Sequence, residues 1–363
     1  IGLPANFNIT KILSMSKENK IRVIVVGAGN MGRSHALAYA SIPEFEIAAI
    51  CTRKPESRAK LMAELPEGTS EANDYSLALE ELKPDAVCIS TYPDTHYRFA
   101  KLALEAGCHV FTEKPLAENT EQCRELVDLA RTQGKALVVG YILRQHPSWI
   151  KFVEVAKTLG KPLVMRMNLN QQSYGKNWET HKSLLSSISP IVDCGVHYVD
   201  VMCQITDAKP VQVRGMGVRL SEEIALDMYN YGQFQVLFDD DSVGWYEAAW
   251  GPMVSETAYF VKDVISPNGA VSIVSAEAGS SADIDSHTKV GRLRVHPSNG
   301  TDRLIDLPDE PDHQALCDSE AAFMAKAINE TVDLTRHMSD AVQSLAICLA
   351  ADESVRSGEP VYL

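Results

Sequence analysis

The feature that most constrains this fold is a group of glycines between a short apolar run and a helical pattern. Residues 21–26 are apolar apart from Arg22, and they lead directly into the glycines. In a strand–turn–helix unit the first glycine allows a tight turn, the second lets the backbone approach a pyrophosphate, and the third lets the helix pack on the strand. The helix start adds free N–H groups and a positive dipole end. The segment predicts a dinucleotide site, with a ligand-free glycine turn as the alternative, at Gly27, Gly29, Asn30, Met31 and Gly32.

Strand-like and helical segments alternate throughout residues 21–140. Strands are expected at 45–50, 86–90, 108–111 and 136–140, and helices at 73–82, 97–106 and 118–132. Such alternation predicts an α/β fold with a doubly wound parallel sheet, that is, a dinucleotide-binding Rossmann domain. Ligands bind such sheets at the carboxyl ends of the strands. We therefore expect one crevice to be surrounded by the loops at 27–33, 51–54, 90–96, 112–115 and 140–144.

The residues after the second strand bear on the choice of cofactor. An NAD site usually has Asp or Glu there, bound to the ribose 2′-hydroxyl, whereas this chain has Thr52, Arg53 and Lys54. A hydroxyl and two cations suit a 2′-phosphate, which favours NADP(H). NAD(H) remains possible if the two cations are solvated loop charges. Further cofactor contacts are expected from the loops after the next strands, at Ser90, Thr91, Tyr92, His96, Glu113 and Lys114.

Lys114 follows an apolar strand and lies between Glu113 and Pro115. Because that strand ends at the cofactor crevice, Lys114 is a candidate acid/base for hydride transfer. An ordinary lysine pKa of about 10.4 is too high for a base at neutral pH. We expect burial and the positive charge of an oxidised nicotinamide to lower the pKa of Lys114. Glu113 would oppose this, and it is expected to point away from the reacting centre.

The pattern changes over residues 141–363. Helices are expected at 147–159, 190–206, 312–330 and 338–356, and strands at 162–170, 211–220, 229–239, 242–250, 256–266, 270–275, 288–296 and 301–306. Turn-forming residues at 239–241, 267–269 and 297–300 predict hairpins. We therefore expect an α+β domain with a large, mainly antiparallel sheet. Residues 173–178 are expected to be a polar aromatic loop, and residues 277–287 a mobile one.

The helix expected at 190–206 carries a polar row on an otherwise apolar segment. Asp193, His197 and Asp200 are spaced i, i+4, i+7, so all three lie on one face. Such a row is costly to bury unless it is used or paired. One alternative is a histidine satisfied by its carboxylate neighbours, and another is a metal site with His181 as third ligand. We favour a catalytic group that partners Lys114 and expect no metal.

Taken together, these motifs resemble a known family. They are the glycine motif with His35, Glu113-Lys114-Pro115, and residues 193–200, joined by a loop at 90–96 similar to that family's Ser/Thr-Pro-x-x-x-His. The chain resembles the glucose-fructose oxidoreductase/inositol dehydrogenase/rhizopine-catabolism family from about residue 21 onward. The resemblance implies a Rossmann domain, an open-faced C-terminal sheet that often builds dimers or tetramers, and a catalytic Lys114, Asp193 and His197. Ser189-Pro190 replaces glycines of many relatives, which bears on the shape of the sugar pocket.

The resemblance implies hydride transfer between a nicotinamide and a secondary alcohol of a sugar, cyclitol or glycoside. Lys114 would be the acid/base, His197 would share the hydroxyl proton, and Asp193 would orient His197. No arginine cluster marks a sugar phosphate, which favours an uncharged substrate. Two alternatives remain: redox-assisted glycoside cleavage or sugar dismutation with a tightly bound cofactor, and a non-enzymatic cofactor-binding regulator. Further substrate contacts are expected at Arg144, His146, Tyr174, Trp178 and His181.

Composition restricts the partners and the compartment. The net charge of −14 over 363 residues argues against nucleic acid. No apolar run approaches the roughly 18 residues that a membrane span needs. The eight cysteines form no CxxC pair and mostly lie in apolar runs, which predicts buried free thiols in the cytoplasm. Residues 1–20 are expected to be a disordered extension or an arm on a neighbouring subunit, with residues 1–14 upstream of a natural start at Met15.

Overall fold

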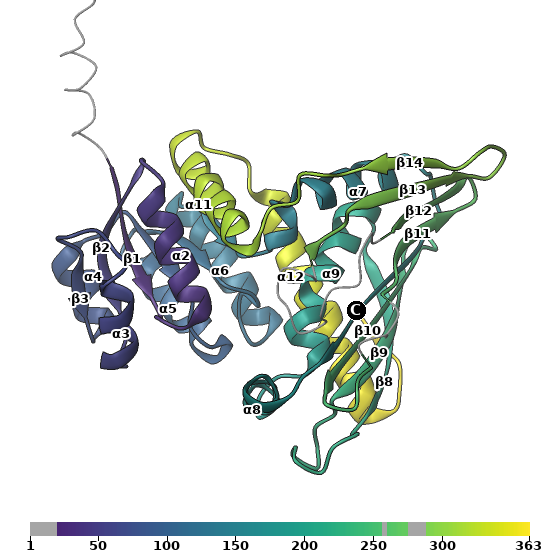
Figure 1. The fold of residues 1–363 in the computed structure, drawn as a ribbon, viewed down its shortest axis with the longest axis horizontal. Coiled ribbons are helices and arrows are strands. Elements are labelled where there is room, and N and C mark those ends of the chain that lie inside the picture. The colour runs from purple at the N-terminus through teal and green to yellow at the C-terminus, as the bar shows by residue number, and fades with distance from the viewer. Residues whose placement is uncertain (1–19, 256–259, 275–287) are drawn as a thin grey trace, which may run out of the picture.

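The computed structural model describes residues 20–255, 260–274 and 288–363, which contain two β-sheets with helices between and around them (Figure 1). The extension expected at 1–20, apart from Lys20, lies outside the described residues, as does the loop expected at 277–287. Within the described residues, no helix is both long and apolar enough to cross a membrane.

The N-terminal sheet has six parallel strands in the order β3-β2-β1-β4-β5-β6. This confirms the doubly wound parallel sheet. The order reverses between β1 and β4, and ligands of such sheets bind at this switch point. The strands are β1 (Ile21–Val26), β2 (Phe45–Cys51), β3 (Ser70–Ala72), β4 (Ala86–Ile89), β5 (His109–Thr112) and β6 (Leu137–Val139).

Five helices connect these strands: α2 (Asn30–Ser41), α3 (Pro55–Met62), α4 (Tyr75–Leu82), α5 (Pro93–Glu105) and α6 (Thr120–Gln133). The side chains of Asp74 and Asn119 cap α4 and α6 by accepting backbone N–H groups. Helix α5 starts four residues before the expected Tyr97, because Pro93 occupies the first helical turn, where its missing N–H costs nothing. Helix α3 and strand β3 were not expected. Leu61 is the one buried residue of α3, so no apolar period marks it.

The C-terminal sheet has nine strands in the order β14-β13-β12-β11-β7-β10-β9-β8-β15. Its β7–β10 pair is parallel and its other described pairs are antiparallel, so the mainly antiparallel sheet is confirmed. Hairpins form at the three expected turns. The strands are β7 (Val164–Gln172), β8 (Pro210–Val218), β9 (Tyr231–Phe238), β10 (Val243–Gly251), β11 (Lys262–Ser266), β12 (Gly269–Ile273), β13 (Arg292–Pro297), β14 (Arg303–Asp306) and β15 (Val361–Tyr362).

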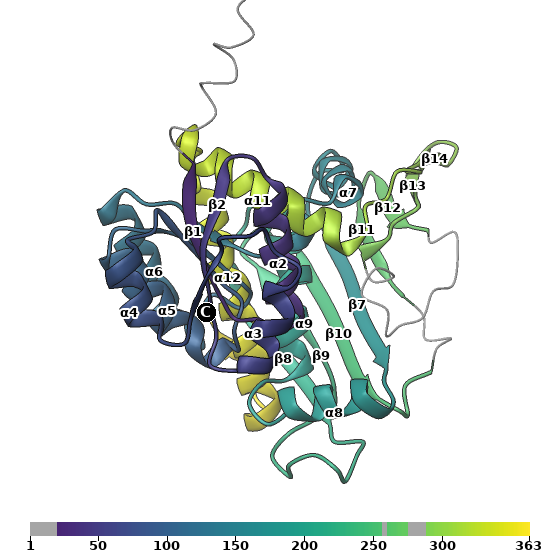
Figure 2. The ribbon, with the colours of Figure 1, turned by 60° about the vertical axis from the view of Figure 1, so that its left-hand side comes forward.

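Helices of the C-terminal part cover one face of this sheet and reach back to the Rossmann domain. They are η1 (Ile142–Arg144, a 3-10 turn), α7 (Pro147–Lys157), α8 (Gly175–Leu184), α9 (Pro190–Thr206), α11 (His313–Asn329) and α12 (Thr335–Ser357). Figure 1 shows α9 and α12 between the two sheets, and Figure 2 shows α11 lying beside α2. The prediction of a loop at 173–178 is wrong, because α8 starts at Gly175. Trp178 is its one buried residue, so its apolar pattern is weak.

Candidate active site

The glycine loop brings β1, α2 and the end of β4 into close contact. Gly27 has φ +105°, and a Cβ there would lie 2.3 Å from the Ser90 carbonyl oxygen. A Cβ on Gly32 would lie 2.3 Å from the Gly27 carbonyl oxygen. Gly29 precedes α2, and a Cβ there would meet nothing within 4 Å. Gly27 and Gly32 are thus required for close packing, whereas Gly29 borders open space at the N-terminus of a helix. This arrangement suits a pyrophosphate.

The other residues expected near the cofactor fall into two groups. Arg53 and Lys54 are exposed at the end of β2 and form no ion pair within the described residues. His96 is fully buried, with its ring nitrogens 2.7 Å from the Pro115 carbonyl oxygen and 3.0 Å from the Thr91 carbonyl oxygen. His96 therefore ties the loop after β4 to the loop after β5. Ser90 is buried below these loops and Tyr92 is exposed.

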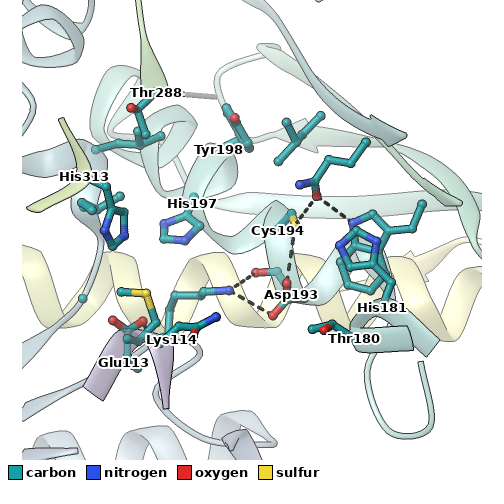
Figure 3. Close-up of a pocket in the computed structure, with 18 of the residues that line it drawn as sticks. Glu113, Lys114, Thr180, His181, Asp193, Cys194, His197, Tyr198, Thr288 and His313 are labelled. Atoms are coloured by element: carbon teal, nitrogen blue, oxygen red, sulfur yellow. Dashed lines mark hydrogen bonds and ion pairs between the residues drawn. The ribbon is translucent and has the colours of Figure 1, made fainter. Parts of the chain in front are cut away.

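A cavity of about 350 Å³ lies between the Rossmann loops and the inner face of the C-terminal sheet. Figure 3 shows its walls. Asn30 and Met31, the first residues of α2 after the glycine loop, line it together with Lys114, and α9 contributes Asp193 and His197. The cavity therefore brings together the expected cofactor loop and the three expected catalytic residues.

Lys114 and Asp193 form the central contact of this cavity. The Lys114 Nζ donates to the Asp193 backbone oxygen at 2.9 Å and to its carboxylate Oδ1 at 3.0 Å. Burial alone would lower the pKa of Lys114, but the Asp193 carboxylate, with help from Glu113, raises it above its ordinary value. Burial likewise opposes ionisation of Asp193, yet Lys114 holds the pKa of that carboxyl below its ordinary value. In the protein alone burial therefore does not suffice to lower the pKa of Lys114, because a carboxylate faces the ammonium. The lowering expected from an oxidised nicotinamide stays a prediction.

His197 lies beside this pair without joining it. Burial and the nearby Lys114 charge lower the pKa of His197 to about 3, so its imidazole is neutral. Its buried Nδ1 has no hydrogen-bond partner among the residues that the structure describes. The expected contact between Asp193 and His197 is not found, because Asp193 binds Lys114 and accepts a weak bond from the Cys194 thiol at 3.5 Å. Because the neutral ring of His197 lines the cavity, it can still bind a hydroxyl group that enters there.

Glu113 lines the cavity, contrary to the expectation that it points away from it. Its Oε1 lies 2.6 Å from Nε2 of His35 on α2. Burial would raise the pKa of Glu113, but the His35 hydrogen bond and nearby positive charge lower it to about 2. Glu113 is therefore an ionised, anchored carboxylate in the wall.

Four residues expected to contact substrate do not line the cavity. Arg144 binds Asp200 at 2.8 and 2.6 Å and Asp340 at 2.7 Å, so the third member of the α9 polar row serves this buried network. His146 caps α7 by accepting the Ser148 N–H. Tyr174 is exposed. The Trp178 indole donates to Glu223 on the far side of α8.

The remaining candidate, His181, lines the cavity from α8. Its ring stacks on Trp250 with centroids 4.5 Å apart, and the Trp250 indole donates to Gln171 at 2.8 Å. These three side chains form an aromatic and amide wall near Asp193. Gln171 and Trp250 were missed from the sequence, because they meet through the parallel β7–β10 pairing, which no turn signals.

The metal alternative finds no geometric support at His181, Asp193 and His197. Among the described residues, the group whose potential ligand atoms converge is His35, Cys317 and Glu320, all within 4.8 Å of one another. Glu320 and His313 on α11 also line the cavity. Neither was foreseen, since they lie about 200 residues after Lys114 and carry no local motif.

Comparison with known proteins gives two family matches. Residues 21–141 match an oxidoreductase family with an NAD-binding Rossmann fold, and residues 153–257 match the GFO/IDH/MocA C-terminal domain. A UDP-N-acetylglucosamine 3-dehydrogenase of Acidithiobacillus ferrooxidans is 32% identical over 54% of this chain and 58% of its own length. A D-glucoside 3-dehydrogenase of Escherichia coli is 32% identical over 52% and 54%. The chain thus spans little more than half the length of these curated relatives.

The fold extends over a larger share of the chain than the sequence alignments. A crystal structure of the Acidithiobacillus ferrooxidans enzyme superposes with a TM-score of 0.75, covering 93% of this chain and 98% of that one at 22% identity. At this identity the likeness concerns the fold, and it includes both sheets.

Proposed function

The chain belongs to the GFO/IDH/MocA oxidoreductase family, and from that premise we propose that it is a nicotinamide-dependent dehydrogenase. It transfers a hydride between the cofactor and a secondary alcohol of a sugar, cyclitol or glycoside. The observation that carries this proposal is the Lys114–Asp193 pair beside a neutral His197, in a cavity that the start of α2 also lines.

The residues around the glycine loop fit the cofactor. Open space beside Gly29 leaves room for phosphate at the start of α2, and Asn30 and Met31 lead from there into the cavity. The bound nicotinamide would supply the hydride acceptor or donor. We favour NADP(H), because Arg53 and Lys54 are exposed at the end of β2, where a 2′-phosphate needs positive charge, and pair with no carboxylate of the described chain.

Lys114 and His197 handle the hydroxyl proton. In oxidation, Lys114 takes the proton once its amine is neutral, and in reduction its ammonium returns it. Asp193 sets the charge state and position of Lys114, and the neutral imidazole of His197, which lines the cavity, binds the same hydroxyl. A base, an orienting carboxylate and a hydroxyl-binding imidazole together match alcohol oxidation.

The substrate is proposed from the relatives and the wall chemistry. Relatives are named for UDP-N-acetylglucosamine, D-glucosides and inositol. Amide and imidazole groups with an aromatic face, as at Gln171, His181 and Trp250, suit a polyhydroxylated ring. We further propose a cytoplasmic location, because all eight cysteines are buried free thiols.

The test is a panel of sugars, cyclitols and glycosides assayed for reduced nicotinamide with NAD and NADP separately. On the best substrate, Lys114→Met should lower turnover by about 10²–10⁴-fold, the range of acid–base catalysis, while cofactor still binds. Lys101→Met removes a partly exposed lysine that pairs with Glu125 and should leave turnover unchanged. Turnover close to that of the wild type in Lys114→Met would contradict the mechanism.

A further inference from the structure

Glu320 is a buried carboxyl group that faces the cavity. It lies on α11, is 3% exposed and lines the cavity wall. Within the described residues it forms no hydrogen bond and no ion pair. A carboxyl in this setting is costly unless it is neutral or meets a ligand. The side chain therefore needs an explanation that the proton transfer at Lys114 does not supply.

The groups around Glu320 favour its protonated form. Burial, and then the negative charge of Glu113, raise the pKa of Glu320 well above its ordinary value. Glu113 itself stays ionised through His35. Two carboxyl groups in one wall thus take opposite charge states, as closely placed carboxylates do. The other titratable groups near Glu320 are His35 and Tyr39 of α2, Cys88 of β4 and His313 and Cys317 of α11.

The position of Glu320 identifies its ligand, given the proposed function. The same cavity is lined by Asn30 and Met31, which follow the phosphate loop, and by Lys114, which must lie beside the reacting carbon. We propose that Glu320 is a binding group for the nicotinamide ring and that, with Glu113, it distinguishes the oxidised ring from the reduced one.

The discrimination follows from charge. The oxidised ring is a cation and favours a carboxylate beside it, so its binding drives the proton of Glu320 into solvent. The reduced ring is neutral and leaves that proton in place. Binding of the oxidised cofactor therefore releases a proton, and its affinity rises with pH up to the pKa of Glu320 in the free protein. The affinity for the reduced cofactor does not rise with pH through this group. Binding of the reduced cofactor is therefore favoured over binding of the oxidised one at acidic pH.

The test measures protons and not turnover. The protein is mixed with NADP⁺ or NADPH in weakly buffered solution near pH 7 with a pH indicator, without substrate. The wild type should release up to one more proton per site with NADP⁺ than with NADPH. The 2′-phosphate occurs in both cofactors, so its titration cancels. In Glu320→Gln, which keeps the shape of the neutral acid, most of this difference should disappear.

Dissociation constants from pH 6 to 9 give the second measurement. The affinity of the wild type for NADP⁺ should rise by up to tenfold per pH unit, and Glu320→Gln should lose this slope. Glu330→Gln, on an exposed residue at the end of the same helix, is the matched control and should behave as the wild type. An equal proton release for both cofactors in the wild type would overturn the inference, as would a difference that persists in Glu320→Gln. Failure of both cofactors to bind would instead overturn the proposed function, and this inference with it.

Discussion

Lys114 cannot accept a proton while it is an ammonium ion bound to Asp193. The pair is mostly buried, and the carboxylate outweighs the effect of burial, so the pKa of Lys114 is raised. Alcohol oxidation therefore begins with an unfavourable deprotonation, whereas carbonyl reduction begins with the acid already in place. In the free protein Lys114 is thus in the protonated state that carbonyl reduction needs. The positive nicotinamide ring lowers the pKa of Lys114 and thereby favours the neutral amine that alcohol oxidation needs.

This balance predicts the effect of Asp193→Asn on the pH profile. Without the carboxylate, burial dominates and the pKa of Lys114 falls. The rising limb of kcat/KM for oxidation should then move to lower pH, and the falling limb for reduction should move with it. Rates measured in both directions across the pH range check this. Asp193→Glu keeps the charge and should retain a limb closer to that of the wild type. A limb that stays in place or moves to higher pH in Asp193→Asn would show that Asp193 does not set the charge of Lys114.

The residue types of the site could be predicted, but their contacts could not. Helical spacing correctly indicates that Asp193 and His197 share a face with access to one cavity. It does not reveal which of them meets Lys114, whose loop comes from another part of the chain. The structure pairs Lys114 with Asp193 and leaves His197 Nδ1 free. Such choices depend on the tertiary approach of two loops, which local patterns do not encode.

At the level of elements, helix and strand boundaries were predictable where capping residues and the spacing of buried apolar residues indicate the same ends. Helix α9 has the expected bounds, because Ser189 caps it, Pro190 opens it and nearly every following position is buried. Helix α8 has one buried residue and no side-chain cap, so its helical character depends on tertiary contacts. The edge strand β3 has no buried residue, so nothing in its sequence marks it as a strand.

Arg144 illustrates how a polar residue can be bound by partners from elements that are distant in the sequence. It extends from η1 to Asp200 on α9 and Asp340 on α12, and thereby joins three elements at the junction of the two sheets. The sequence places Arg144 beside the last Rossmann strand, which favoured a substrate contact. Asp340 lies 196 residues further on, so no local pattern could indicate that the charge is already satisfied.

We predict that Arg144→Met destabilises the protein without a matching loss of substrate affinity. Removal of Arg144 leaves the buried Asp200 carboxylate without a cation, whereas Asp340 keeps its ion pair with Arg336. This loss should lower the free energy of unfolding by roughly 3–5 kcal/mol. Urea unfolding followed by tryptophan fluorescence measures this, and KM for the best substrate should change little. Arg131→Met, which removes an exposed pair with Asp128, should leave stability nearly unchanged. Wild-type stability with a strongly raised KM would instead support a substrate contact.

At the scale of the whole molecule, the two sheets differ in how they are covered. The Rossmann sheet has helices on both faces, as parallel sheets require. The C-terminal sheet has α9 and α12 on the face turned toward the Rossmann domain, and no described helix crosses its other face (Figure 1). Apolar side chains form a row on that open face, because the strand register places Ile265, Val164, Val243 and Leu237 side by side across four strands. Three of them are more than a third exposed.

This row predicts that two copies of the chain associate through the open face. A contiguous exposed apolar strip on a sheet typically marks an interface, and the most common arrangement is a two-fold one in which the same patch occurs on both sides. Leu237→Glu should therefore shift the protein to a smaller species in light scattering after gel filtration, with its circular dichroism unchanged. Leu77→Glu, on an exposed leucine of α4, is the matched control and should leave the size unaltered.

Symmetry decides how large this effect should be. In a two-fold interface the same substitution occurs on both subunits, so Leu237→Glu places two carboxylates in one apolar patch. Their repulsion adds to the loss of buried apolar surface. The mass should then fall fully to the smaller species at micromolar concentration. An asymmetric contact would receive one charge and lose only part of its affinity. A wild type that is already monomeric at that concentration, or a variant that keeps the mass of the wild type, would show that the open face has another role.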